Sequence, residues 1–204
     1  MGFDKMKNLS LTERRKMETR KAIADAACDL FLRDGFDNVT VEAIAAESGV
    51  SLRTFYRYSP SKEDVLAPII NEGMIMFVDL IDDRPEEEDL ATAILEAFRE
   101  ISPDDNEDGL RQTIGLMLEI PALRARWLDS MRQAEERLVP VIMRRTGNRP
   151  SELEARITAS AAISTLRLAL ENTVATNSGR SLIAELETSL EYFRQGAGLN
   201  PAMA

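Results

Sequence analysis

The chain has 204 residues, 44% of them hydrophobic, a length and composition typical of one large or two small folded domains. It contains no histidine and a single cysteine, Cys28. This excludes an internal disulfide, Ser-His-Asp and Cys-His nucleophiles and imidazole metal ligands, so we expect no enzyme, no metal site and no cofactor. The first residues lack a signal-peptide apolar run, and no segment approaches the ~20 apolar residues of a membrane helix, so we expect a cytoplasmic protein.

The net charge of −10 is unevenly distributed along the chain. Residues 1–62 contain 11 Lys or Arg and 9 Asp or Glu, and every lysine lies at or before Lys62. Residues 63–204 contain the other 14 basic and 26 acidic residues. A basic head on an acidic body is typical of a protein whose N-terminal part faces a polyanion. Compositional drift would produce the same asymmetry, so charge alone does not decide.

The first predicted helix begins at Ser10, after a tail at 1–9 that we expect to be mobile. Ser10, followed three residues later by Glu13, resembles a capping box, in which each side chain binds the other residue's backbone N–H. Gly35 tolerates a left-handed conformation and ends the helix. Apolar residues at helical spacing predict one buried face, formed by Ile23, Ala27, Leu30 and Phe31.

Two short helices follow, with a tight turn between them. Thr40 is suited to cap the first, at 41–48, and Ser51 to cap the second. The second ends before Pro60, because the residue preceding a proline is disfavoured in a helix, and Gly49 supplies the turn. This pattern predicts a helix-turn-helix. Its shared core would include Val41, Ile44, Ala45, Val50 and Phe55.

The rest of the chain predicts about six more helices and no strand. We expect the first to start at Ser61 and to run to about Leu80, with a kink at Pro68. The acidic segment Asp82–Asp89 is expected to be a flexible connection. Proline and glycine residues separate the remaining helices, which we place at 90–101, 107–119, 121–146, 151–177 and 181–195.

The segment from Thr40 to Asp64 resembles the TetR family of transcriptional regulators, through the runs TVEAIAAESGVS, TFYRY and PSKED. The resemblance implies an all-α protein. Residues 1–60 would form a three-helix DNA-binding domain and residues 61–204 a ligand-sensing and dimerisation domain of about six helices. The implied function is that of a ligand-responsive regulator, usually a repressor, that binds a pseudo-palindromic operator as a homodimer. Ser59 stands where the family usually has an aromatic residue.

Residues in and beside the helix-turn-helix are the candidate DNA contacts. The resemblance places Leu52 and Arg53 at base edges, where a guanidinium can bind guanine through two hydrogen bonds. It implies phosphate contacts for several of the others. The predicted set is Thr40, Ser51, Leu52, Arg53, Thr54, Tyr56, Arg57, Tyr58 and Lys62. Each has a simpler alternative, such as a solvated surface charge for Arg53 and amphipathic packing for Tyr56.

Apolar residues of the C-terminal part predict a pocket for a small-molecule effector, although most would serve equally well as core. The candidates are Met74, Phe77, Phe98, Met117, Trp127, Met131 and Arg167. Arg167 is more simply interpreted as a surface cation. Small side chains at 151–177 permit close helix approach, so we expect a two-plus-two helix dimer, with burial inside one chain as the alternative. The predicted interface residues are Ala159, Ala162, Leu186, Leu190 and Phe193.

The leading hypothesis therefore predicts three partners: an operator in double-stranded DNA, a second copy of the chain and an unidentified small molecule. An alternative is a helical protein that binds a small molecule or a partner protein without operator-specific DNA binding. The acidic body and Ser59 favour it. A helical enzyme that uses Glu119 and Glu171 is less consistent with the sequence, because nothing pairs these two carboxylates.

Overall fold

The computed structural model describes residues 10–102, 107–147, 149–176 and 179–196, and its regular elements within these ranges are all helical. Contacts divide the chain into two compact units, a first unit of 1–73 with 115–130 and a second unit of 74–114 with 131–204. The expected mobile tail lies outside the described residues. None of the described helices is sufficiently long and apolar to cross a membrane. The domain boundary after residue 60 stays a prediction.

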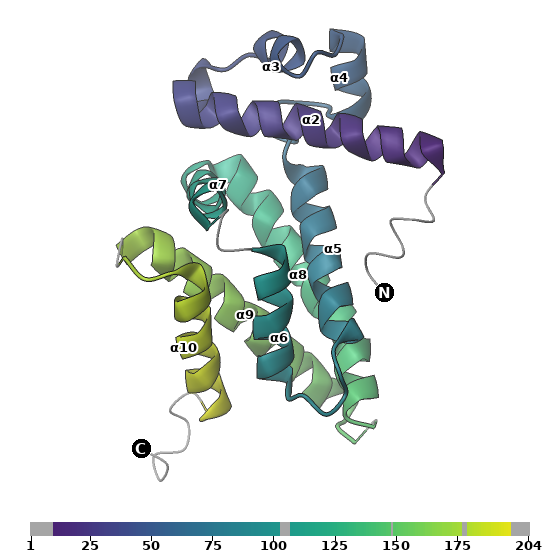
Figure 1. Ribbon diagram of the computed structural model, residues 1–204, viewed down its shortest axis with the longest axis vertical. Coiled ribbons are helices and arrows are strands. Elements are labelled where there is room, and N and C mark those ends of the chain that lie inside the picture. Colours follow the sequence, from purple (N-terminus) through teal and green to yellow (C-terminus); the bar gives the residue numbers. More distant parts are fainter. Residues whose placement is uncertain (1–9, 103–106, 148, 177–178, 197–204) are drawn as a thin grey trace. The chain divides into compact units, whose positions relative to one another are not determined.

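The first unit contains the three helices predicted from the N-terminal part of the sequence (Figure 1). Its elements are α2 (Leu11–Asp34), the 3-10 helix η1 (Phe36–Asn38), α3 (Val41–Glu47) and α4 (Leu52–Tyr58). The capping box is present: Ser10 Oγ accepts a hydrogen bond from the Glu13 N–H at 3.3 Å, and the Glu13 carboxylate accepts from the Ser10 hydroxyl at 2.7 Å and N–H at 2.9 Å. These bonds to Ser10 lower the pKa of Glu13, so the cap is charged at neutral pH.

The core of the first unit forms where α3 and α4 pack around α2. Ile44 and Phe55 are completely buried, and the small side chain of Ala45 is only 3% exposed where the two short helices approach each other. The turn between them places Gly49 at a φ of +69°, a conformation that favours glycine. The Val50 N–H then donates to the Ala45 carbonyl at 2.9 Å. The local pattern therefore forms the predicted helix-turn-helix, although Val50 is only half-buried.

The helix predicted to start at Ser61 begins later. It is α5 (Ala67–Asp83), and the preceding residues form turns in which Ser61 Oγ donates to the Asp64 carboxylate at 3.1 Å. Pro68 therefore lies in the first turn of α5, where a missing N–H has no helical acceptor to lose. This proline belongs to a helix start, and the sequence-based expectation of a kink inside a longer helix was wrong.

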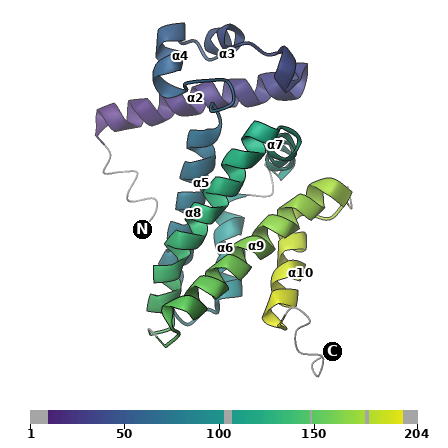
Figure 2. The same ribbon diagram turned by 180° about the vertical axis from the view of Figure 1, so that it is seen from behind.

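The second unit contains parts of α5, α7 and α8 and the whole of the other C-terminal helices. Their bounds are α6 (Leu90–Ile101), α7 (Glu107–Glu119), α8 (Pro121–Arg145), α9 (Glu152–Thr176) and α10 (Leu182–Arg194). No bound differs from its predicted position by more than one residue. α10 packs against both α9 and α6 (Figures 1 and 2).

The connection between α5 and α6, expected to be flexible, is held by Arg145 in the last turn of α8. Its guanidinium donates to four backbone carbonyls at 2.7–3.3 Å, those of Ile81, Arg84, Pro85 and Glu88. The connection also contains an internal ion pair, in which the Arg84 guanidinium donates two hydrogen bonds to the Glu88 carboxylate, at 2.6 and 2.9 Å. A segment with these bonds is ordered by tertiary contact, which the acidic sequence did not indicate.

We expect Arg145→Ala to lower the free energy of unfolding by about 1–3 kcal/mol, because partly buried carbonyls lose their donor. The matched control is Arg144→Ala, whose ion pair with Asp82 is substantially exposed. Such pairs contribute about 0–1 kcal/mol. Urea denaturation followed by circular dichroism measures both variants. Equal losses of stability would contradict the role assigned to Arg145.

Candidate nucleic-acid interface

One face of α4 is exposed, opposite the side that enters the core of the first unit. Phe55 points into that core, whereas Leu52 and Tyr56 are 40% and 53% exposed. At the start of the helix, Ser51 Oγ accepts a hydrogen bond from the Thr54 N–H at 3.1 Å. The exposed residues of this segment are Ser51, Leu52, Arg53, Tyr56 and Arg57. A short helix with this outer face is suited to a DNA major groove.

Arg53 is the cation of α4 that is most available to a ligand. It is exposed, and within the described residues its guanidinium forms no hydrogen bond or ion pair. By contrast, Arg33 on α2 is held by two hydrogen bonds to the neighbouring Asp34 carboxylate, at 3.0 and 2.9 Å. Arg53 therefore keeps its whole set of donors for a base edge or a phosphate.

Tyr58, the last residue of α4, is half-buried and lies beside two arginines. The guanidinium carbon of Arg57 is 4.9 Å from the centre of its ring, and that of Arg20 on α2 is 5.9 Å away. Arg20 also pairs with Glu72 on α5 at 3.3 Å. These contacts hold the end of α4 against α2 and place two guanidinium groups beside the phenol ring, one of which is paired with a carboxylate.

Lys62 has an internal role that the sequence did not indicate. Its ammonium donates to the carbonyls of Phe36 at 2.7 Å and Val39 at 3.0 Å, and lies 4.3 Å from the centre of the Phe36 ring. Both carbonyls belong to the connection between α2 and α3. Because two of its three donors are occupied, we assign Lys62 to the support of this connection, in place of the predicted phosphate contact.

We expect Lys62→Met to lower the free energy of unfolding by about 1–3 kcal/mol, because two carbonyls lose a charged donor. The slope of log affinity for DNA against log salt concentration should stay unchanged, whereas loss of a phosphate contact would reduce it by about 0.9. Thermal denaturation and DNA titrations at several salt concentrations measure the two effects. Lys21→Met is the control, since Lys21 is exposed and pairs with Asp25 on the same helix. A reduced slope with unchanged stability would contradict our assignment.

Ser59 occupies the position where an aromatic residue is usual in the family. It is 2% exposed, and its hydroxyl donates to the Ser61 carbonyl at 2.8 Å. The polar group is therefore satisfied within the turn that follows α4. Val65 and Leu66, at the end of the same turn region, are also buried. In this chain the position is therefore part of a hydrogen-bonded turn.

The predicted effector-pocket residues mostly form core. Five are buried: Phe77, Phe98, Met117, Trp127 and Met131. Phe77 and Phe98 pack edge to face in the second unit, with ring centres 6.5 Å apart, and Met74 is half-buried. The Arg167 guanidinium pairs with the Glu171 carboxylate at 3.0 Å, consistent with a surface cation. The pocket stays a prediction.

Four of the five predicted dimer residues are buried inside one chain, namely Ala159, Ala162, Leu186 and Leu190. They contribute to the core of the second unit, where α10 packs against α9, so they cannot contact a second copy. Phe193 is half-buried. The prediction for these four residues was wrong. Small side chains indicate that another helix packs closely against their own, but they do not indicate whether that helix belongs to the same chain.

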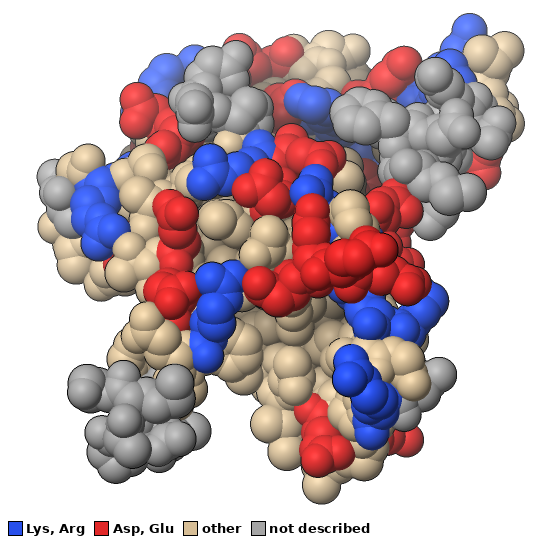
Figure 3. All heavy atoms as spheres, turned by 60° about the horizontal axis from the view of Figure 1, so that its bottom comes forward, with Lys and Arg blue, Asp and Glu red and all other residues tan. Residues whose placement is uncertain are grey.

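Charge limits where a polyanion can approach the protein. Figure 3 shows a face on which acidic side chains gather in a broad band, with basic side chains between them. Residues 63–204 contain 26 acidic and 14 basic residues, so the C-terminal part as a whole repels DNA. The exposed cations of α4 lie outside this acidic part of the chain, in the N-terminal 62 residues, where basic residues outnumber acidic ones by 11 to 9.

These features define the class of the protein as an all-helical regulator with an N-terminal helix-turn-helix. Residues 23–69 match the family profile described as "Bacterial regulatory proteins, tetR family", and residues 85–198 match the profile described as "MftR C-terminal domain". The chain belongs to the tetR family of transcriptional regulators.

Two known transcriptional regulators are similar to the chain in sequence. It is 31% identical over 145 residues to the transcriptional regulator TcmR of Streptomyces glaucescens, a match that covers 67% of this chain and 64% of TcmR, less than two thirds of that protein's length. It is 26% identical over 149 residues to MftR of Mycobacterium tuberculosis, which is named for the transcriptional regulation of mycofactocin biosynthesis, with 72% and 75% of the two chains covered.

Two solved structures share the fold. FadR from Bacillus halodurans superimposes with a TM-score of 0.62 at 24% identity, over 85% of this chain and 93% of FadR. The complex of SmeT with triclosan superimposes with a TM-score of 0.63, also at 24% identity, over 85% and 88% of the two chains. At this level of identity the likeness shows the fold alone.

Proposed function

We propose that this protein is a ligand-responsive transcriptional repressor that binds a pseudo-palindromic DNA operator as a homodimer. The observation that carries the proposal is the outer face of α4, where Arg53 is exposed and unpaired within the described residues. In this proposal α4 enters the major groove with Leu52 and Arg53 at base edges. The surrounding residues bind the DNA backbone, namely Thr40, Ser51, Thr54, Tyr56, Arg57 and Tyr58.

Two of these residues, Thr40 and Ser51, lie at the starts of helices. Thr40 Oγ1 accepts from the Ala43 N–H at 3.2 Å and caps α3, while Ser51 caps α4. Both residues are exposed. Because the N-terminus of a helix favours negative charge, a phosphate beside either cap would be stabilised by the helix as well as by the hydroxyl.

The homodimer would form through the outer faces of α9 and α10. Leu153, Ile157 and Leu168 are 66%, 60% and 54% exposed and fall on one face of α9, since their separations correspond to about one and three helical turns. Tyr192 on α10 is 59% exposed. A second copy that presents the same face around a two-fold axis would remove these apolar side chains from water. The spacing of the α9 residues was visible in the sequence, but their exposure was not.

We place the effector in the C-terminal part, beside the packed rings of Phe77 and Phe98. Two proteins with this fold were solved with small molecules, SmeT with triclosan and FadR of Thermus thermophilus with lauroyl-CoA. An effector that favours a half-site spacing unlike that of the operator would reduce DNA affinity. Operator DNA would then reduce effector affinity by the same factor.

Fluorescence anisotropy titrations with DNA that flanks the protein's own gene test this function. We expect binding that is specific for one site, weakens with added salt and exceeds binding to a random duplex of the same length. Titrations at two salt concentrations provide both comparisons. Binding without site preference, or no salt-sensitive binding, would favour the alternative of a small-molecule or partner-binding protein that lacks operator-specific DNA binding.

A further inference from the structure

A cleft of about 620 Å³ lies within the first unit, between the end of α2 with η1 and the junction of α7 with α8. Its apolar lining includes the rings of Phe31 and Phe36 and the side chain of Ile120. A volume of this size accommodates a drug-sized molecule. None of the residues predicted for the effector pocket lines it, so the cleft is a different candidate site.

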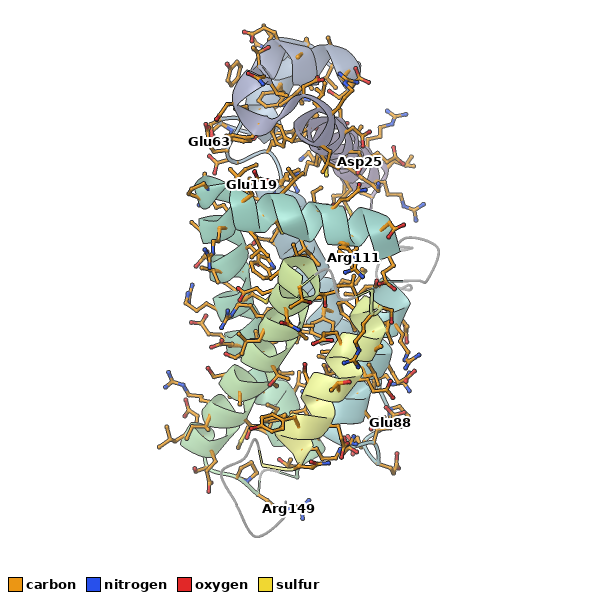
Figure 4. The ribbon with its side chains drawn as sticks, turned by 90° about the vertical axis from the view of Figure 1, so that its left-hand side faces the viewer. Asp25, Glu63, Glu88, Arg111, Glu119 and Arg149 are labelled. Atoms are coloured by element: carbon orange, nitrogen blue, oxygen red, sulfur yellow. The ribbon has the colours of Figure 1, made fainter. Side chains whose placement is uncertain are left out.

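Three carboxylates line the cleft, those of Asp37, Glu63 and Glu119. Figure 4 shows Glu63 and Glu119 near each other, on the segment after α4 and at the end of α7. All three are exposed, and within the described part of the chain none forms an ion pair. The described lining includes no Lys or Arg. The cleft therefore combines an apolar wall with three carboxylates that form no ion pair within the described residues.

The helix ends around the cleft add to this negative potential. α2 ends at Asp34 and α7 ends at Glu119, whereas α8 begins at Pro121. Because a helix C-terminus carries about half a negative charge and an N-terminus about half a positive charge, two C-termini outweigh one N-terminus. The nearby ammonium of Lys62 is held by two carbonyls over the Phe36 ring, 4.3 Å from its centre. The Phe36 ring therefore already contacts one ammonium group, an interaction that is favourable for aromatic rings.

We propose that this cleft binds a small organic cation, an ammonium group attached to an aromatic or alkyl body. The body would lie against Phe31, Phe36 and Ile120, and the ammonium would face the carboxylates of Glu63 and Glu119. Such a ligand would contact both the α2–α3 connection and the α7–α8 junction of the first unit. The site is additional to the proposed operator and effector sites, and its occupancy can be measured without DNA.

Isothermal titration calorimetry of the full chain with 4-phenylbutylammonium tests the proposal, with 4-phenylbutan-1-ol as the neutral probe of similar shape. We expect the ammonium to bind about tenfold more tightly than the alcohol, equivalent to about 1.4 kcal/mol. The double variant Glu63→Gln with Glu119→Gln should weaken ammonium binding by about tenfold and leave alcohol binding unchanged. Glutamine keeps the size of these exposed side chains, so the fold should be retained.

The control is Glu86→Gln with Glu87→Gln, which changes the net charge by the same amount at two exposed residues between α5 and α6. Because these residues lie outside the cleft lining, ammonium binding should be unaffected. Three outcomes would overturn the proposal: equal affinities for the two probes, ammonium binding that is unchanged in the Glu63 and Glu119 variant, and equal weakening in both double variants. The last would indicate a long-range charge effect without a site.

Discussion

Arg53→Ala is expected to weaken binding to the cognate operator by about 5- to 150-fold, or about 1–3 kcal/mol, and to relax the sequence preference within each half-site. The guanidinium is exposed and forms no hydrogen bond or ion pair within the described residues, so its removal should leave protein stability unchanged. Anisotropy titrations with the operator, and with duplexes that change one base pair at a time, measure both the affinity and the preference.

Two further arginine variants separate base contact from general electrostatic attraction. Arg57→Ala should weaken binding to all sequences alike, because Arg57 is proposed to contact the DNA backbone. Arg137→Ala removes one exposed positive charge from α8 at a residue outside the proposed DNA contacts, and should have little effect. If Arg53→Ala leaves both affinity and sequence preference unchanged, or behaves like Arg57→Ala, the assignment of Arg53 to a base edge is wrong.

Ile157→Glu combined with Leu168→Glu is expected to convert the proposed homodimer to monomers. Each copy would place two carboxylates in a buried apolar interface, and an unpaired buried charge costs several kcal/mol. Because the two half-sites would no longer be bound by one assembly, affinity for the full operator should fall by about 10²–10⁴-fold. Sedimentation velocity measures the assembly state, and anisotropy titration measures the loss of affinity.

Leu128→Glu is the matched control for this pair. Leu128 is also an apolar residue at the surface, 41% exposed on α8, but it lies outside the proposed α9–α10 face. The control should stay dimeric. Leu186→Ala makes a different test, because Leu186 is completely buried, and it should destabilise the subunit by about 2–5 kcal/mol. A dimer that survives the double Glu substitution, or dissociates equally in Leu128→Glu, would contradict the proposed face.

The sequence by itself determined most helix boundaries, because their signals act within a few residues. The capping box at Ser10 and Glu13 and the cap at Ser51 are formed as expected, and Gly49 adopts the left-handed conformation that the turn requires. The candidate contacts of α4 were also predictable. A helix of seven residues with Phe55 as its buried anchor leaves Arg53 and Tyr56 outside.

Only the tertiary structure decided which residues each helix face or charged side chain contacts, because these contacts join residues that lie far apart in the sequence. Lys62 binds carbonyls that lie 26 and 23 residues earlier, and Arg145 binds carbonyls at the end of α5 and in the connection that follows, 57–64 residues earlier. The same reason explains the error over the dimer residues, since Ala159 packs inside the chain while Ile157, two positions earlier, is 60% exposed. Periodicity identifies the faces of a helix, but packing selects the one that is buried within the subunit.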